Sequence, residues 1–214
     1  MKILALDSAL KRASAAILSE NHVLGAASGE GSAALAVLAG RALAASGLAA
    51  RDLDAVAATV GPGSFTGIRA GLALASGLAL AAGIPVVGVS VAEAIAASLP
   101  DVPPGAFGEH LWVAIDSRRG HVFLDRAGEL ASYALASLPR PAGPVVLAGD
   151  AAEAVAPFLG AEARLAAVLL PDAAGVARAA ALRLAGRLPP RASLPLYVDP
   201  PAALPAEGAR PSPA

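Results

Sequence analysis

The chain has 214 residues, a formal net charge of -1 and no cysteine, and 56% of its residues are hydrophobic. This composition predicts a globular protein with one large core or two small lobes. The absence of cysteine excludes disulfides, thiolate metal ligands and cysteine nucleophiles. A near-neutral charge removes the broad electrostatic attraction on which non-specific nucleic-acid binders depend.

The N-terminal region predicts a three-stranded meander followed by a helix. Strands are expected over residues 3–6, 14–18 and 22–27, because each segment is apolar and ends at turn-forming residues. A helix is expected over residues 33–46, with Gly47 at its C-terminal end. Asp7 falls where a secretory signal would still be apolar, so we expect no export segment and a cytoplasmic protein.

The most informative segment is residues 61–69, which read Gly-Pro-Gly-Ser-Phe-Thr-Gly-Ile-Arg. It separates an expected strand over 53–60 from an expected helix over 68–82. Such a turn directs unpaired backbone N–H groups at one spot, where an anion or a partner's backbone could bind. A tight turn without a ligand is the alternative. The spacing matches neither the P-loop nor the dinucleotide-binding fingerprint.

Residues 70–92 carry no charge and are numerous enough to span a bilayer. Gly83-Ile-Pro85 interrupts this stretch, which favours a helix, a turn and a buried strand over 86–89, without membrane association. A short helix is expected over 90–99. The proline-rich residues 100–105 then mark a boundary. We therefore expect an N-terminal lobe at 1–99, a smaller C-terminal lobe at 106–198 and a disordered tail at 199–214.

The second half of the chain repeats features of the first. Leu4-Ala-Leu-Asp7-Ser8 and Val113-Ala-Ile-Asp116-Ser117 are both apolar strands that end in Asp-Ser before a turn and a returning strand. A strand over 145–148 echoes the one over 55–60, since each precedes a glycine and a helix-forming run. These echoes predict a two-lobe duplication. A last helix over 173–187, capped by Asp172, and an edge strand over 194–198 complete the expected elements.

Taken together, these motifs resemble those of the TsaB (YeaZ) family in the same order along the chain. The resemblance includes Gly77-Leu-Ala-Leu80, Pro85-Val-Val-Gly-Val-Ser90 and Ala114-Ile-Asp-Ser-Arg-Arg119 besides the glycine loop. It implies an α/β class with a duplicated ribonuclease H-like, actin- and Hsp70-type ATPase fold in two lobes, whose mixed sheets are flanked by helices. Related proteins were once described as glycoprotease-like.

The resemblance also implies a function. In that family the subunit is a required, non-catalytic partner of the paralogue TsaD, with which it forms a heterodimer, and it works with the ATPase TsaE. Together they place a threonylcarbamoyl group on the adenosine next to the anticodon of tRNAs that read ANN codons. The near-neutral charge predicts that another subunit holds most of the tRNA, so that this chain contacts it indirectly. We further expect a homodimer when TsaD is absent, and ATP or ADP at the partner interface is the one cofactor left open.

We expect no catalytic residue and no metal site, because the three histidines, His22, His110 and His121, lack the helical pairing of a metal site. In the helix after the glycine loop, small residues recur every three or four positions and predict a flat face. That face packs either on a partner helix or on the protein's own sheet. The expected partner or dimer interface comprises Ser64, Phe65, Thr66, Gly67, Arg69, Gly71 and Ala75.

A second expected site is a nucleotide or anion contact formed by Asp7, Ser8, Gly63, Ser64 and Asp116. Asp7 and Asp116 either help to hold a metal ion around phosphates, as acids do in actin-like ATPases, or cap their turns through local backbone bonds. Arg118 and Arg119 either touch tRNA phosphate or form a solvated hairpin tip.

The competing function is a stand-alone enzyme, either an ATPase that uses a cleft between the lobes or a peptidase of the glycoprotease-like group. The chain has no His-Glu-x-x-His motif, no Gly-x-Ser-x-Gly elbow and no cysteine, which disfavours a peptidase. Two arginines instead of glycines follow the second Asp-Ser pair, which disfavours an ATPase.

Overall fold

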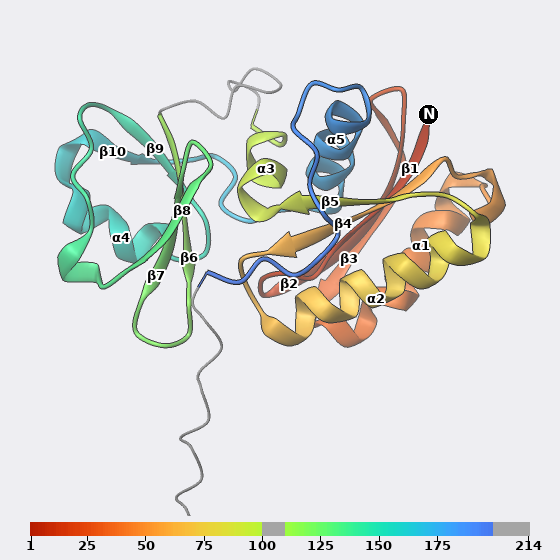
Figure 1. Cartoon of the computed structure of the whole chain (residues 1–214), viewed down its shortest axis with the longest axis horizontal. Helices are drawn as coiled ribbons and strands as arrows, with labels where there is room; N and C mark the ends of the chain where they lie inside the picture. The colour runs from red at the N-terminus through yellow and green to blue at the C-terminus, as the bar shows by residue number, and fades with distance from the viewer. Residues whose placement is uncertain (100–109, 199–214) are drawn as a thin grey trace, which may run out of the picture.

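A computed structural model describes residues 1–99 and 110–198 of the chain as two mixed sheets, each flanked by helices (Figure 1). The expected boundary at 100–105 and the expected tail at 199–214 lie outside the described residues. The division into lobes at residues 99 and 106 remains a prediction.

The first sheet has the strand order β3-β2-β1-β4-β5. An antiparallel meander forms one side of it, and β4 and β5 add to β1 in parallel. The strands are β1 (Lys2–Asp7), β2 (Arg12–Ser19), β3 (His22–Glu30), β4 (Ala55–Gly61) and β5 (Val86–Ser90). The helices of this half are α1 (Leu35–Ser46), α2 (Phe65–Ala82) and α3 (Val91–Ala96).

The second sheet has the order β10-β9-β6-β7-β8. Its strands are β6 (Leu111–Asp116), β7 (Val122–Arg126), β8 (Glu129–Tyr133), β9 (Val145–Ala148) and β10 (Ala163–Leu165). Between β9 and β10 lies α4 (Ala152–Leu159), and α5 (Ala173–Leu184) follows β10. The sequence did not predict β8 and β10, which are short strands at the sheet edges.

The predicted duplication is confirmed by topology. In each half the first three strands form an antiparallel meander. The fourth strand pairs in parallel with the first strand of the meander, and the fifth pairs in parallel with the fourth. This is the predicted ribonuclease H-like arrangement in two copies, the fold shared by actin- and Hsp70-type proteins.

The first sheet separates two apolar layers. Because side chains alternate along a strand, Leu4 and Leu6 of β1 enter one layer while Ile3 and Ala5 enter the other. Helices α1 and α2 lie side by side over the first layer, and α5 covers the opposite layer (Figure 1). The first layer continues into the second half of the chain, where Val113 on β6 joins it. The halves therefore share core packing.

Helix α2 is long and apolar enough, by length and composition, to cross a bilayer. In the structure it packs on β4 and has a buried stripe that includes Leu72 and Ala79. Gly83 ends it in a left-handed conformation, and β5 follows. The predicted helix, turn and strand are confirmed.

The C-terminal part of the described chain returns to the first sheet. Helix α5 packs on β1 and β2, although the division predicted from sequence places it in the second lobe. Residues 194–198 are not the predicted edge strand. The chain instead passes close to β4 and β5: Leu196 N–H donates to Val60 O at 2.7 Å, and the carbonyl of Ala192 lies against Gly88. We call residues 188–198 the strap.

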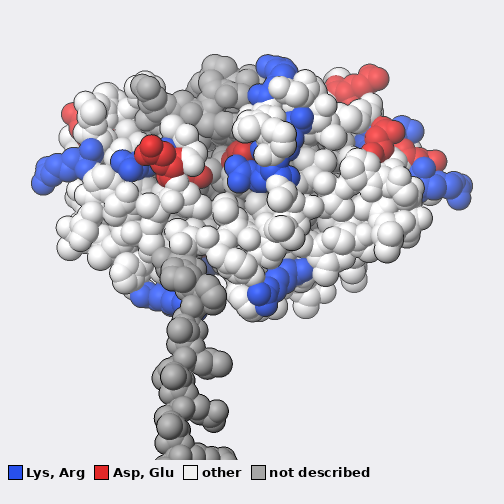
Figure 2. Space-filling model, in the orientation of Figure 1, with Lys and Arg blue, Asp and Glu red and all other residues white. Residues whose placement is uncertain are grey.

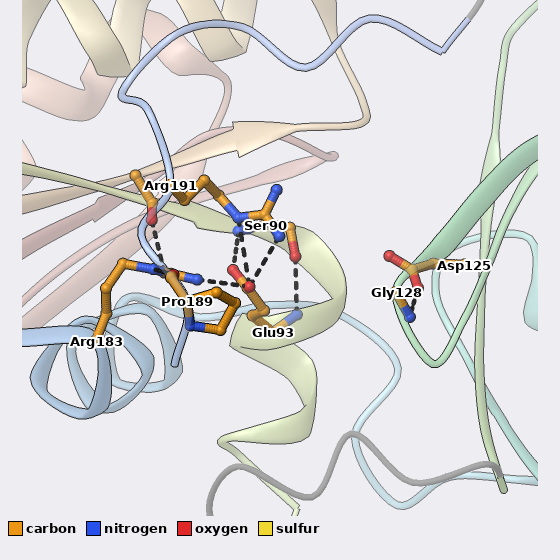
Figure 3. Close-up of polar contacts among 8 residues, drawn as sticks. Ser90, Glu93, Asp125, Gly128, Arg183, Pro189 and Arg191 are labelled. Carbon is orange, nitrogen blue, oxygen red and sulfur yellow. Dashed lines mark hydrogen bonds and ion pairs between the residues drawn. The ribbon is translucent and has the colours of Figure 1, made fainter. Parts of the chain in front are cut away.

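A buried ion-pair network fixes the strap (Figure 3). The Glu93 carboxylate accepts hydrogen bonds from Arg183 of α5 at 2.6 Å and from Arg191 of the strap at 2.9 Å. Its second oxygen accepts the Ser90 N–H at 2.7 Å in a capping box at the start of α3. Burial raises the pKa of Glu93, but these hydrogen bonds and arginine charges outweigh it and lower the pKa overall.

Asp125 of β7 faces this network from the second sheet (Figure 3). Burial and, to a smaller extent, the negative charge of Glu93 raise the pKa of Asp125 above its ordinary value. The hydrogen bond from Gly128 N–H and the charge of Arg191 lower it only in part. The network therefore couples α3, α5, the strap and the second sheet electrostatically.

Replacement of Glu93 by Gln should destabilise the protein strongly. The amide keeps an oxygen for the Ser90 N–H but leaves two guanidinium groups without their buried countercharge, so we expect a loss of about 3–5 kcal/mol in the free energy of unfolding. Urea denaturation measures this. Glu129→Gln is the matched control, because Glu129 is 82% exposed beside Arg126, and it should cost less than about 0.5 kcal/mol. Equal losses in the two variants would contradict the assignment.

Candidate functional site

The glycine loop packs directly against the turn between β1 and β2. Ser64 N–H donates to Ala9 O at 2.7 Å, and the Ser8 hydroxyl donates to Gly67 O at 2.8 Å. A Cβ atom on Gly63 would collide with Ala9 O, and one on Gly67 would collide with Ser8 O. Glycine is therefore required at both positions by the close approach of two backbones. The loop amide of Ser64 is satisfied within the protein and is not free for an anion.

Ser64 caps the first turn of α2, because its hydroxyl accepts the Gly67 N–H at 3.1 Å. Thr66 also carries a hydroxyl, but it lies inside the helix and is exposed.

The small-residue stripe of α2 faces the protein's own core rather than solvent. Gly67, Gly71 and Ala75 are buried, and a Cβ on Gly71 would lie 3.1 Å from the Ser8 hydroxyl and 3.8 Å from a methyl group of Leu35. This corrects their expected place in a partner interface, because the stripe lets α2 approach the β1–β2 turn and α1 closely. Ser64, Phe65, Thr66 and Arg69 are exposed.

A different stripe of α2 is exposed, and it is apolar. Leu80 is 85% exposed, and Val37 on the neighbouring α1 is 57% exposed. A Cβ on Gly40 or Gly77 would meet no atom within 4 Å. Figure 2 shows that the surface over α2 is almost free of charged side chains. We call this the α1/α2 face. Its members are Ala36, Val37, Gly40, Arg41, Ala44, Ala73, Ser76, Gly77, Leu80 and Ala81.

Asp7 and Asp116 both cap their turns. The Asp7 Oδ1 accepts the Ala9 N–H at 3.2 Å and the Thr59 hydroxyl at 2.8 Å. Asp116 accepts the Arg118 N–H at 2.8 Å. The described residues contain no group of three or more His, Cys, Asp or Glu side chains placed to hold a metal ion.

Asp7 is nevertheless unusual, because it is only 1% exposed and its Oδ2 has no hydrogen-bond partner among the described residues. Burial raises its pKa from 3.8 to about 6, although the bonds from Ala9 and Thr59 and the charge of Arg12 lower it. Asp7 thus sits below the turn as a buried acid, and it does not line the cleft described next.

A cleft of about 780 Å³ lies between the two halves. The two Asp-Ser turns border it through residues 9–11 and 116–119, and the glycine loop and the strap also line it. Of the expected anion-contact residues, Gly63, Ser64 and Asp116 line the cleft, whereas Asp7 and Ser8 are buried behind it.

Among the cleft residues that sequence reasoning did not single out are Lys11 and Tyr197. Arg69 Nε and Nη2 donate to the Tyr197 hydroxyl at 3.1 and 2.7 Å, a contact between residues far apart in the chain. Across the cleft, Arg118 pairs with Asp150 at 3.0 Å and with Asp116 at 3.5 Å. The hairpin tip is therefore anchored at Arg118. Tyr197 lies in the apolar run Leu194-Pro-Leu-Tyr-Val198, from which only an edge strand was expected, and no local pattern pointed to its contact with Arg69.

Replacement of Asp7 by Asn should flatten the pH dependence of stability. Between pH 3.8 and about 6 the folded protein holds a proton on Asp7 that the unfolded chain has released, so the free energy of unfolding falls as pH rises through this window. The amide cannot ionise and removes up to about 3 kcal/mol of that fall. Urea titrations from about pH 4 to pH 7 measure it. Thr59→Val is the matched control. It removes a hydrogen bond that lowers the pKa of Asp7, so the pKa should rise further and the fall should extend to higher pH. A pH dependence unchanged in both variants would contradict the assignment.

Comparison with known proteins places the chain in a family. The model of the family described as TsaD, tRNA N6-adenosine threonylcarbamoyltransferase, matches residues 25–156. The curated protein TsaB of Escherichia coli, a tRNA threonylcarbamoyladenosine biosynthesis protein, is 34% identical over 130 residues, covering 58% of this chain and 53% of that protein. The protein of the same name from Haemophilus influenzae is 33% identical over 129 residues, covering 59% and 53%. The chain thus spans about half the length of these two curated relatives.

Two solved structures from Pseudomonas aeruginosa share the fold over 92% of this chain and 99% of theirs. One is YeaZ, with a TM-score of 0.73, and the other is a protein described as similar to peptidase YeaZ, with a TM-score of 0.76. Both are 26% identical to this chain. The family model, the relatives and the shared duplicated fold together show that the chain belongs to the tRNA N6-adenosine threonylcarbamoyltransferase family, in which its relatives are the TsaB (YeaZ) proteins.

Proposed function

We propose that this chain is a non-catalytic subunit that pairs with a TsaD-type paralogue in the cytoplasm and supports threonylcarbamoyl transfer to the adenosine beside the tRNA anticodon. The names of the curated relatives support the pathway. The observation that carries the subunit role is the α1/α2 face, where two neighbouring helices expose alanine, glycine and leucine with almost no charge.

This face has the chemistry of a helix-packing surface. Gly40 and Gly77 leave open space where a side chain would stand, so a partner helix can approach the backbone and gain dispersion contacts along its length. Leu80 and Val37 project from the same surface as apolar anchors. A fully exposed leucine contributes little to folding, whereas burial in an interface removes its apolar area from water.

The partner in this proposal is the paralogue, which would present an equivalent pair of helices. A second copy of this chain would cover the same face when the paralogue is absent, because a symmetric dimer places one patch against itself. The exposed residues Ser64, Phe65, Thr66 and Arg69 border the face at the start of α2. Gly67, Gly71 and Ala75 are buried, so they would not touch the partner but would set the position of α2.

Further parts of the proposal follow from the family. TsaE would join the assembled pair, and ATP or ADP would be held at the partner interface rather than by this chain alone. The cleft residues Gly63, Ser64 and Asp116 are the remaining candidates for that contact.

Replacement of Leu80 by Glu should weaken the complex with the paralogue by about 100-fold, because an unpaired carboxylate would be buried against apolar side chains. Folding should change by less than about 0.5 kcal/mol, since Leu80 is exposed. Isothermal titration of the two purified subunits measures the affinity. Leu165→Glu places the same charge on β10, where Leu165 is 43% exposed, and should bind normally. Normal binding by Leu80→Glu would remove the α1/α2 face from the proposal.

The subunit role itself is tested by reconstitution. Formation of the modified nucleoside by the paralogue and TsaE should depend on this chain, and Leu80→Glu should reduce the yield in proportion to lost complex. A yield that is the same without the chain would overturn the proposal. Hydrolysis of ATP or of peptides by the purified single chain, at rates that a catalyst requires, would favour the stand-alone enzyme instead.

A further inference from the structure

An aromatic and guanidinium cluster stands at the mouth of the cleft. The Arg69 guanidinium carbon lies 3.6 Å from the centroid of the Phe65 ring and 5.9 Å from that of Tyr197. Phe65 is 59% exposed and Tyr197 is 52% exposed. Arg69 has no carboxylate partner among the described residues, and its hydrogen bonds to the Tyr197 hydroxyl hold its plane in place. The Phe65 and Tyr197 rings are tilted by 36°, with centroids 6.4 Å apart, and the three side chains form an exposed aromatic and guanidinium surface that we call the platform.

Cations from two turns face this cleft beside the platform. Lys11 projects from the β1–β2 turn, and Arg118 and Arg119 project from the β6–β7 turn. Arg118 is already paired with Asp116 and Asp150, whereas Lys11 and Arg119 form no ion pair within residues 1–99 and 110–198. The cleft is therefore lined by more positive than negative charge in a chain whose net charge is -1. Uncompensated cations beside a stacking surface suit a ligand that is flat at one end and anionic at the other.

We propose that the cleft mouth binds an unpaired nucleotide of single-stranded RNA, with its base stacked on the platform and its phosphates beside Lys11 and Arg119. Aromatic rings and guanidinium planes stack with any base that is not already stacked in a duplex. Lys and Arg side chains neutralise the adjoining phosphates and make the affinity salt-dependent. A base inside a double helix cannot reach the platform, so the site selects loops over duplexes.

This inference rests on the proposed function for the identity of the nucleic acid, and it adds a direct RNA contact to the subunit role. The platform lies at the first turn of α2, and the α1/α2 face continues along the later turns. An RNA loop held at the cleft mouth would therefore lie beside the bound paralogue. The chain would in this way help to present the loop to the subunit that performs the transfer.

Fluorescence anisotropy with the full chain tests the proposal. The probes are a labelled RNA hairpin with an unpaired loop, a fully paired RNA of equal length, and ATP as competitor. We expect the hairpin to bind at least about tenfold more tightly than the duplex, and Phe65→Ala to weaken it by about tenfold. The double variant Lys11→Ala/Arg119→Ala should weaken binding and lower the slope of log affinity against log salt by about 1.4.

Arg164→Ala is the matched control, because Arg164 is an exposed arginine on β10 outside the cleft, and it should bind as the unaltered chain does. Circular dichroism melting confirms that each variant folds. Three results would each overturn the proposal: equal affinity for hairpin and duplex, no effect of Phe65→Ala, or displacement of the hairpin by ATP at the concentration where ATP alone saturates the site. If the chain does not bind the hairpin but formation of the modified nucleoside still requires it, the proposed subunit role is retained and the proposed RNA contact is rejected.

Discussion

The contact between the glycine loop and the β1–β2 turn is the constraint on which the rest of this structure depends. Two backbones approach so closely there that Gly63 and Gly67 leave no room for a Cβ atom. The loop follows β4 and the turn follows β1, and these strands are parallel neighbours. One contact therefore sets both the start of α2 and one wall of the cleft. The glycine motif is explained by packing, without a phosphate.

The two halves of the chain share a strand order but differ in their helices, and this difference locates the α1/α2 face. In the second half, α4 takes the place of α2 with 8 residues instead of 18. The described segment between β8 and β9, where α1 would lie, holds only a short 3-10 turn at Leu135–Ser137. Within the described residues, only the first half thus exposes two long neighbouring helices on one face. The Glu93 network and the strap tie α3 and α5 to the first sheet.

The candidate site was only partly predictable. The helical spacing of small residues in α2 was visible in the sequence, but this spacing does not reveal whether the small residues face the core or the solvent. Gly71 turns inward because the Ser8 hydroxyl and Leu35 occupy the space beside it, and Leu80 is consequently turned outward. The platform was not predictable, because Arg69 and Tyr197 meet only when the strap folds back across the sheet.

The sequence by itself determined the order of most elements, the duplication and the caps, since Ser64, Ser90 and Asp172 act through bonds to residues three positions away. These features depend on local geometry, which a short window contains. The tertiary structure alone decided the rotation of α2, the return of α5 to the first sheet and the path of the strap. Each of these depends on competition among distant apolar surfaces and buried charges, such as Glu93 with Arg183 and Arg191, and no local pattern records its outcome.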